Sequence, residues 1–538
     1  SMLTKNITTS NYFCLGRSFI FLIKGIDNHM KKRLQTFLFW FILIQPFLDI
    51  YWLSRPPLLK FSLPSILRVL GVFIAIILFF SIKSNWQRLK KQWWIITYIA
   101  ILILYSLCHL FSVKNFTGVD PTSFGYSTKV EIFYLIRACL PLIVIYITSY
   151  SDFKTKYFFR VIQAISGLYS LTIVISNLLV FSLTSYHTTG AKRISANIFS
   201  WFTQTNYPFN ALASKGIFFQ ANTLSAILFM IMPIMLYILY KEFNLLNIVL
   251  VSAQALAMLM LGTKVGNFGL IISLVIFLII FLFHSLILKN TKFSAKFLIT
   301  LICILAASSA IFPYSPTLRR SSLENGVAQK RSNLGDKNRL DQDLDSGLKR
   351  YKGQKQEEYL KNFIKKNYWV YSLKNDLVLD HYSYKNEPYY WLDVMKRPAT
   401  ERLNYRHLEQ DILSRVMNND KNKLNKLFGI SFSRENNIAP LERDFLAQYY
   451  SMGLLGTILL TVIYIFVLGY GIFYWLVNKN SKTLLISSLL LSGGFILFAA
   501  FYAGNVLEYL SATLVMAFIL GFLLQNIRYS RTAKKLMK

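Results

Sequence analysis

An acidic pair, Glu442 and Asp444, lies where a long polar segment of the chain meets a strongly apolar one. A carboxylate next to hydrocarbon is unfavourable unless it is paired or used, and a carboxylate can also take a proton from a hydroxyl. Glu442 is therefore the first candidate general base and Asp444 the second. Both residues also have a structural interpretation, because a carboxylate at the start of a helix is stabilised by the helix dipole or acts as its cap.

Arg402 and Arg406 are the first candidates for binding an anionic group. Apolar residues at near-helical spacing predict one helix over residues 401–417, and a separation of four residues places both guanidiniums on one face of it. Two such groups side by side would hold a pyrophosphate through paired hydrogen bonds. The alternative is a solvated helix face, with Arg406 paired to Glu409 or Glu401.

Two further cations lie at or inside apolar segments. Lys264 ends the turn Leu261-Gly-Thr-Lys264 between two closely spaced apolar runs, and Arg137 lies within another run. A charged residue in a membrane helix is by default a functional candidate. For Arg137, an ion pair with Glu131 or Glu508 is the structural alternative.

The polar segment also contains an aromatic cluster and a basic stretch. Residues 368–391 hold eight Tyr and Trp residues, including Tyr389 and Trp391. Such side chains settle at membrane interfaces, and they also stack on sugar rings, so both interpretations stay open. Residues 314–350 are expected to be flexible, whereas residues 352–372 are expected to form a helix with a basic face.

Most of the chain that positions these residues is apolar. Of 538 residues, 54% are hydrophobic and 16% are charged, and the mean hydropathy is +0.41, a balance that soluble domains do not reach. Twelve apolar runs can span about 30 Å of hydrocarbon. They lie at 36–54, 62–82, 93–112, 130–150, 157–183, 217–240, 245–262, 267–288, 296–313, 446–477, 483–503 and 507–526. Because lipid excludes unpaired backbone groups, the runs predict an all-α polytopic membrane protein with about 12 transmembrane helices.

The polar segment divides these helices into two groups. The sequence predicts a cytoplasmic or interfacial N-terminal segment at 1–35 and transmembrane helices one to nine at 36–313. A large, mostly helical extracytoplasmic loop at 314–445 precedes helices ten to twelve at 446–526 and a basic cytoplasmic tail at 527–538. The tenth run is long enough to tilt or to project from the membrane. The natural start is expected at Met2 or Met30.

Charge fixes the expected orientation. With cytoplasmic termini, the cytoplasmic tails and short loops hold 23 Lys and Arg residues, and the opposite short loops hold eight. The positive-inside rule therefore places both termini in the cytoplasm and the large loop outside. The net charge of +34 comes mainly from these loops and membrane edges, so it does not indicate nucleic acid binding. The large loop contains none of the four cysteines, which excludes a disulfide framework or a cysteine zinc cluster there.

Four short patterns, in order along the chain, resemble the O-antigen ligase and Wzy-type polysaccharide polymerase superfamily, which are membrane glycosyltransferases of the GT-C kind. Gly216-Ile-Phe-Phe-Gln-Ala-Asn222 is similar to the Gly…Asn stretch of that family, and the turn ending at Lys264 to its Thr-Gly-Ser-Arg turn. Leu427-Phe-Gly-Ile430 resembles its Phe-Gly-Val-Gly turn. The segment 441–456 resembles its His-Asn-x-x-Leu…Gly-x-x-Gly pattern, with Glu442 in the place of His, as in the acidic version associated with Gram-positive members.

The resemblance implies an enzyme of the bacterial cytoplasmic membrane that transfers or polymerises glycan from an undecaprenyl-pyrophosphate-linked donor to a sugar hydroxyl. Such a reaction needs a base for the hydroxyl and cations for the departing pyrophosphate, and it inverts the anomeric centre if attack is direct. Glu442 or Asp444 would be the base, with no cofactor and no metal. The pyrophosphate-binding candidates are Arg402, Arg406, Lys264 and Arg137, and the glycan- or lipid-contacting candidates are Asn222, Tyr389 and Trp391.

Other functions remain open on the sequence. A lipid-linked oligosaccharide flippase or transporter also has about twelve spans, although transporters usually show related halves and short outer loops. A peptidoglycan polymerase of the shape-and-division type and a noncatalytic scaffold are further alternatives. Polymerase and ligase are not separated by these patterns, and neither the sugars nor the acceptor is identified.

Overall fold

The computed structural model describes residues 27–54, 62–118, 125–186, 190–203, 211–320, 335–402, 404–504 and 506–536. Over these residues the chain is helical, and β-structure is limited to three isolated bridges. The prediction of an all-α polytopic membrane protein is confirmed. Of the predicted cytoplasmic or interfacial segment at 1–35, residues 1–26 lie outside the described residues, and residues 27–35 are helical.

Ten of the described helices are long and apolar enough to cross a membrane. They are built from α4 (Leu63–Phe80), α6 (Trp93–Ser112), α7 (Thr128–Tyr150), α8 (Thr155–Leu178), α10 (Ala221–Lys241), α12 (Lys264–Leu282), α13 (Ala295–Ile311), α22 (Asp444–Thr457) continued by α23 (Ile463–Val477), α24 (Leu484–Ala503) and α25 (Leu510–Leu536). We call this group, with the shorter apolar helix α11 (Leu245–Met260), the bundle. Ten of the twelve predicted spans therefore meet the length criterion. Two predicted spans do not meet it. The seventh corresponds to the shorter helix α11, and the first is divided into a helix at 27–43, α2 (Gln45–Leu48) and α3 (Tyr51–Ser54).

Short elements join these helices. They are α5 (Lys83–Lys91), η1 (Val113–Asn115), α9 (Ser200–Thr203), the π-turn η4 (Phe283–Ile287), η5 (Phe312–Tyr314), the π-turn η7 (Ile458–Val462) and η8 (Lys479–Ser481). In the most apolar 18-residue stretch of each helix, 89% of the residues are buried in α10 and in α25, against 17% in α6 and in α13. The bundle therefore has α10 and α25 at its centre, and α6 and α13 at the edge that lipid would cover.

Between α13 and α22 the chain forms a separate helical unit, which we call the cap (residues 335–402 and 404–443). Its elements are α15 (Gly335–Arg350), α16 (Gln354–Asn367), the π-turn η6 (Asp376–His381), α17 (Pro388–Lys396), α18 (Ala399–Arg402), α19 (Tyr405–Asn419), α20 (Asn425–Phe428) and α21 (Phe432–Ile438). The cap has its own hydrophobic core, distinct from that of the bundle. Helix α15 shows that the expectation of a flexible segment is wrong for residues 335–350, whereas α16 agrees with the expected helix.

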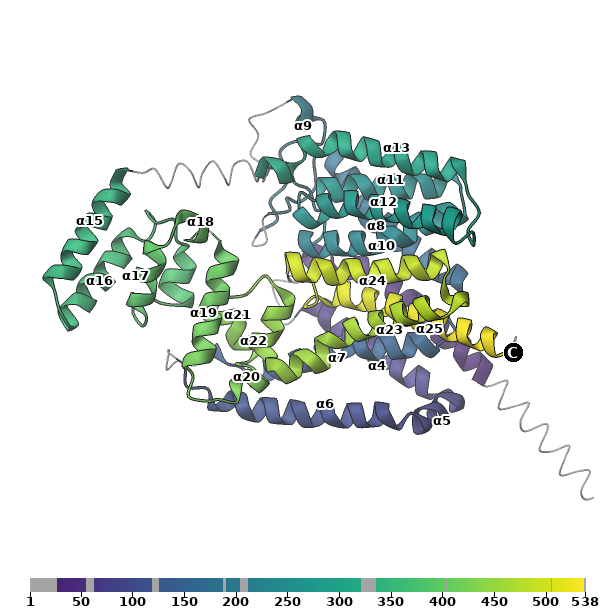
Figure 1. Cartoon of the computed structure of the whole chain (residues 1–538), viewed down its shortest axis with the longest axis horizontal. Coiled ribbons are helices and arrows are strands. Elements are labelled where there is room, and N and C mark those ends of the chain that lie inside the picture. Colours follow the sequence, from purple (N-terminus) through teal and green to yellow (C-terminus); the bar gives the residue numbers. More distant parts are fainter. Residues whose placement is uncertain are drawn as a thin grey trace, which may run out of the picture.

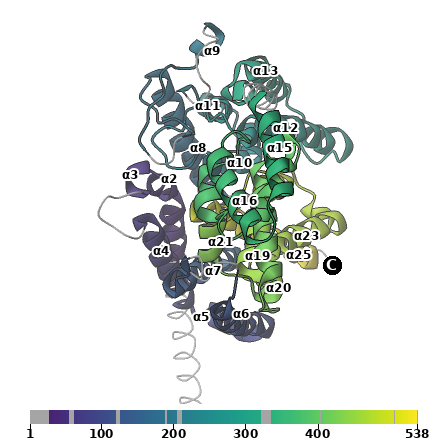
Figure 2. The ribbon, with the colours of Figure 1, turned by 90° about the vertical axis from the view of Figure 1, so that its left-hand side faces the viewer.

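The cap lies at one end of the bundle, and the C-terminus lies at the other (Figure 1). Seen from the cap side, α15 and α16 stand in front of the bundle helices (Figure 2). This arrangement is compatible with a predicted extracytoplasmic cap and cytoplasmic termini, and the sidedness itself stays a prediction.

Candidate active site

The cap meets the bundle where helix α22 is broken. At Gly453 the backbone leaves the helical region, with φ of 69° and ψ of −177°. Two carbonyls just before the break accept hydrogen bonds from the cap: Tyr450 O from Ile430 N at 2.8 Å, and Ser451 O from Ser431 N at 3.1 Å. The long tenth span therefore does not run straight, because its first part pairs with a turn of the cap.

Two glycines make this close approach possible. A Cβ on Gly453 would lie 2.3 Å from the carbonyl carbon of Leu427, and a Cβ on Gly429 would lie 2.1 Å from Ser451 O. Both glycines also have positive φ, a conformation that side chains disfavour. On the bundle side, the Tyr105 hydroxyl donates to Met452 O at 2.7 Å. The Leu427–Ile430 turn and the Gly453 segment, predicted as separate motifs, are therefore one structural unit.

A fully buried pair fastens the same junction from the bundle. His109 Nε2 of α6 lies 2.8 Å from Glu131 Oε1 of α7, and neither side chain is exposed. His109 Nδ1 lies 2.6 Å from Phe428 O, while Glu131 accepts from the backbone N–H groups of Phe432 and Ser433 at 3.1 and 3.3 Å. Both oxygens of Glu131 therefore have protein donors. We call His109 and Glu131 the clamp, because together they hold the backbone of the cap at Phe428, Phe432 and Ser433.

Glu442 lies on the cap side of the junction and pairs with Arg406. Glu442 Oε2 accepts from Arg406 Nη2 at 2.8 Å and from Nε at 3.2 Å, with side chains 46% and 37% exposed, respectively. Arg406 also donates to the carbonyls of Tyr502 and Ala503 at 3.0 and 3.3 Å, at the C-terminal end of α24, where a cation is favoured. We call Arg406 and Glu442 the open pair, because Glu442 Oε1 accepts from no donor among the described residues.

Asp444 has a different role from its neighbour. It is buried, and its two oxygens accept from Val506 N at 2.8 Å and Leu507 N at 3.1 Å. Asp444 therefore holds the α24–α25 loop against the start of α22 rather than capping its own helix. Gly504 of the same loop lies directly against the backbone of Glu442, where a Cβ would come within 2.1 Å of Glu442 C.

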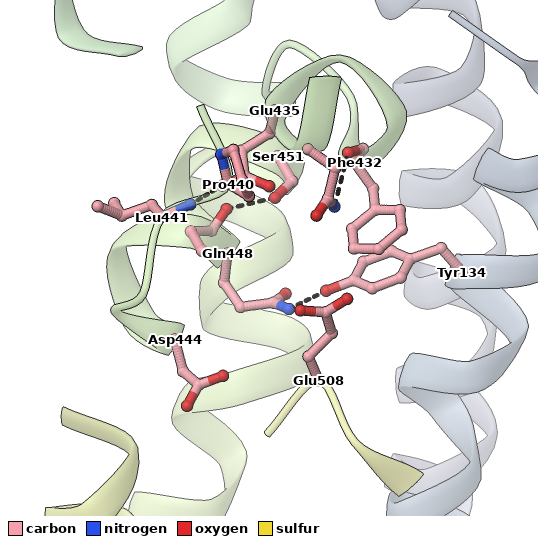
Figure 3. Close-up of a pocket in the computed structure, with 11 residues that line it drawn as sticks. Tyr134, Phe432, Glu435, Pro440, Leu441, Asp444, Gln448, Ser451 and Glu508 are labelled. Atoms are coloured by element: carbon pink, nitrogen blue, oxygen red, sulfur yellow. Dashed lines mark hydrogen bonds between the residues drawn. The ribbon is translucent and has the colours of Figure 1, made fainter. Parts of the chain in front are cut away.

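A narrow pocket lies beside this loop. Glu435, Asp444 and Glu508 contribute to its walls, together with Tyr134 and Gln448 (Figure 3). The Gln448 amide donates to the Tyr134 hydroxyl, and the Glu508 carboxylate points toward both groups. Gln448 Oε1 is buried and has no hydrogen-bond donor among the described residues.

Arg137 reaches this region from α7. Its Nη2 donates to the backbone carbonyl of Glu508 at 2.7 Å, so Arg137 holds the α24–α25 loop through the main chain. The alternative of a pair with Glu131 is wrong, since Glu131 belongs to the clamp. Burial raises the pKa of Glu508, and the positive charge of Arg137 opposes that rise. Burial also raises the pKa of Glu435 well above its usual value, although the N–H of Leu441 favours the ionised form.

Arg402 and Arg406 do not share a helix face. Asn404 lies outside the helical region, with φ of −83° and ψ of 80°, so Arg402 ends α18 whereas Arg406 belongs to α19. The prediction of one helix over 401–417 is wrong for this reason. Arg402 is buried in the cap, where it donates to Tyr371 O at 3.2 Å and stacks over the Tyr371 ring.

The two aromatic candidates also differ from each other. Trp391 is fully buried in the cap core and donates to Tyr382 O at 2.8 Å, which leaves no ring surface for a sugar in this conformation. Tyr389 is 49% exposed. Most of the predicted aromatic cluster is therefore core of the cap rather than a membrane belt or a sugar platform.

The remaining candidates lie on the bundle. Lys264 is exposed at the first residue of α12, and no contact among the described residues joins it to Glu442. Asn222 is half-buried in the first turn of α10. The preceding Gln220 donates to the Tyr509 hydroxyl at 2.9 Å, which ties the start of α10 to the loop that carries Glu508.

Sequence reasoning missed four residues of the junction: His109, Tyr134, Glu435 and Gln448. Of these, only His109 carried a usable signal, as a polar residue inside an apolar run that has Glu131 in the next run. No group of three or more His, Cys, Asp or Glu side chains placed to hold a metal ion occurs within the described residues.

Comparison with known proteins agrees with the resemblance. The family described as O-antigen ligase like membrane protein matches residues 31–530, which covers the cap and all of the bundle except the last turns of α25. No curated protein matches the chain.

Proposed function

The chain belongs to the family of O-antigen ligase like membrane proteins, and we propose that it is a membrane glycosyltransferase that transfers or polymerises glycan from an undecaprenyl-pyrophosphate-linked donor. In this proposal it lies in a bacterial cytoplasmic membrane with the cap outside. The acceptor is a hydroxyl of another glycan.

The open pair carries the proposal. The side chains of the Arg406–Glu442 ion pair are both partly exposed, unlike those of the clamp, and Glu442 keeps one oxygen without a donor among the described residues. A general base needs such an oxygen within hydrogen-bond reach of the hydroxyl that it deprotonates. Asp444 lacks one, since both of its oxygens hold the α24–α25 loop. The proposal therefore assigns the base to Glu442 and loop positioning to Asp444.

The proposed step is a direct displacement at the anomeric carbon. Glu442 Oε1 accepts the proton of the acceptor hydroxyl. At the same time the oxygen of that hydroxyl bonds to the anomeric carbon, and the bond from this carbon to the pyrophosphate oxygen breaks. Attack from the face opposite the leaving group inverts the centre. The lipid pyrophosphate leaves with the bonding electrons and carries the developing negative charge.

Arg406 connects the two halves of this step. While Glu442 is ionised, the guanidinium orients it through two hydrogen bonds. Protonation of Glu442 neutralises the carboxylate that pairs with Arg406. The guanidinium can then bind the departing pyrophosphate, for which its planar pair of N–H donors is suited. Lys264 is the second proposed cation for the pyrophosphate, whereas the proposal omits Arg402 because it is buried in the cap. Arg137 keeps a positioning role through the backbone of Glu508.

The experiment is a turnover assay on the full chain in nanodiscs with undecaprenyl-pyrophosphate oligosaccharides from the same host. A ladder of lengthened lipid-linked glycan identifies a polymerase, and transfer that requires an added second acceptor identifies a ligase. Arg406→Gln is expected to reduce turnover at least tenfold in either case. Passage of labelled lipid across a liposome bilayer, with no new glycosidic bond under any condition, contradicts the proposal and supports a flippase.

A further inference from the structure

One face of helix α16 is basic and exposed. Lys355, Asn362 and Lys366 follow one another at intervals of seven and four residues, which places them along one side of the helix, and Trp369 lies in the turn that follows the end of α16 at Asn367. Lys365 lies beside this row, and all five side chains are exposed. We call these five residues the α16 face.

The charge on the α16 face has no partner within the described part of the chain. None of its three lysines forms an ion pair there, whereas the neighbouring Lys361 pairs with Glu357 at 2.6 Å. The exposed carboxylate of Glu358 lies within this face, three residues after Lys355 and seven before Lys365, so three lysines stand against one carboxylate. The surface therefore presents a net positive charge that an extended anionic ligand would neutralise.

Trp369 adds a flat apolar surface to this charge. Its side chain is 63% exposed, yet its ring is held in place, because the indole N–H donates to Lys366 O at 2.9 Å. The fixed ring lies beside Lys365 and Lys366 in the chain. An exposed, oriented indole next to cations fits a ligand with alternating apolar and anionic surfaces, such as a pyranose chain that carries carboxylates or phosphates.

The position of α16 argues against the protein's own membrane as the partner. Helices α15 and α16 form the part of the cap most distant from the bundle in Figure 1, and they stand in front of it in Figure 2. Electrostatic attraction to a charged surface is screened within about 10 Å in ordinary buffers. A partner that approaches the far side of the cap from solvent is therefore favoured over the bilayer around the bundle.

We propose that the α16 face binds an anionic glycan chain, with Trp369 stacked on one sugar ring and the three lysines on carboxylate or phosphate groups of neighbouring sugars. The choice of a glycan rests on the proposed function, whereas the requirement for a polyanion rests on the surface alone. The face would hold an acceptor or product chain at a distance from the open pair and hence keep it near the junction between successive transfers.

The test measures binding without turnover, so its result does not depend on the catalytic proposal. The full chain, in nanodiscs of neutral lipid, is titrated with an oligogalacturonate and with a neutral maltooligosaccharide of the same length. Binding of the oligogalacturonate alone is expected, with an affinity that falls as salt rises. The triple variant Lys355→Gln, Lys365→Gln, Lys366→Gln should weaken it about tenfold, and Trp369→Ala about fivefold, with Trp369→Phe close to wild type.

The matched control removes three exposed lysines elsewhere on the cap: Lys421→Gln, Lys423→Gln, Lys426→Gln. Its affinity should stay within about twofold of wild type. Equal weakening by both triple variants would reduce the effect to overall charge and overturn the proposal. Unchanged binding by the α16 triple variant would overturn it as well, and so would α16-dependent binding to anionic vesicles without binding to the oligogalacturonate.

Discussion

Two acid–base pairs join the cap to the bundle, and they are built in opposite ways. In the clamp, His109 and Glu131 are completely buried, and every acceptor of Glu131 is used by the protein. In the open pair, Arg406 and Glu442 are more than a third exposed, and one oxygen of Glu442 stays without a donor among the described residues. The two pairs at one junction thus differ in burial and in how far the protein itself uses their polar atoms.

Under the proposed function, this difference assigns stability to the clamp and catalysis to the open pair. A buried and fully used pair is strongly destabilised when one partner is removed, because the other is left desolvated and unpaired. An exposed pair contributes little to stability, so its residues are available to exchange protein contacts for substrate contacts. The clamp should therefore control whether the cap is seated, and the open pair whether the seated cap catalyses.

The largest expected effect is at the clamp. Glu131→Ala should lower the free energy of unfolding by about 3–5 kcal/mol, because it leaves His109 and the N–H groups of Phe432 and Ser433 without their acceptor. Thermal unfolding in detergent and limited proteolysis of the cap measure this loss. Glu401→Ala, an exposed carboxylate of the cap, is the control and should be neutral. An equally stable Glu131→Ala protein would remove the distinction between the pairs.

The next effect concerns the glycine contact beside the clamp. Gly453→Ala places a Cβ 2.3 Å from Leu427 C at a φ of 69°, so the turn of the cap must separate from α22. We expect a loss of about 2 kcal/mol or more in unfolding free energy. Gly469→Ala in the same span meets open space and should change stability by less than about 1 kcal/mol. Similar unfolding midpoints for the two variants would contradict the close approach.

A third effect is pH-dependent and lies inside the cap. Burial raises the pKa of Glu409 to about 7, with Lys374 as the opposing charge, and Glu409 Oε2 is buried without a donor in the described residues. The folded cap therefore holds a proton that the unfolded chain has already lost. This stabilisation is complete below pH 4.5 and is lost as the pH rises through about 7.

Glu409→Gln removes the contribution of Glu409 to this pH dependence. At pH 8 the variant should be more stable than wild type by about 1–3 kcal/mol, and its unfolding midpoint should fall less between pH 5 and 8 than that of wild type, because Glu435 and Glu508 keep their own dependence. Thermal unfolding at several pH values measures both. A wild-type midpoint that rises with pH over this range would contradict the sign.

The helices were predictable because hydropathy determines them locally. Ten of the twelve apolar runs became helices of membrane-spanning length, and the polar segment became a helical cap. The breaks were not predictable in the same way. Gly453 leaves the helix because the turn at Gly429, 24 residues earlier, packs its backbone against it. A contact between distant segments cannot be inferred from local sequence preferences.

The candidate site was predictable in part for a related reason. Glu442 and Arg406 could be named from residue type and position, although their partnership depends on how α19 meets the end of α24. Spacing assigned Arg402 to the same face as Arg406, but the non-helical Asn404 separates them. Composition likewise did not distinguish buried Trp391 from exposed Tyr389, since that choice depends on which side of α17 faces the cap core.

The most direct test of the account is the turnover of Glu442→Gln in the nanodisc assay, measured together with its unfolding midpoint. The account predicts a loss of activity of about a hundredfold or more, because the variant lacks the base, with a midpoint close to wild type, because the open pair is exposed. Glu442→Asp, which keeps the carboxylate, should retain more activity than Glu442→Gln. Wild-type turnover by a folded Glu442→Gln protein would contradict the assignment of Glu442 as the base.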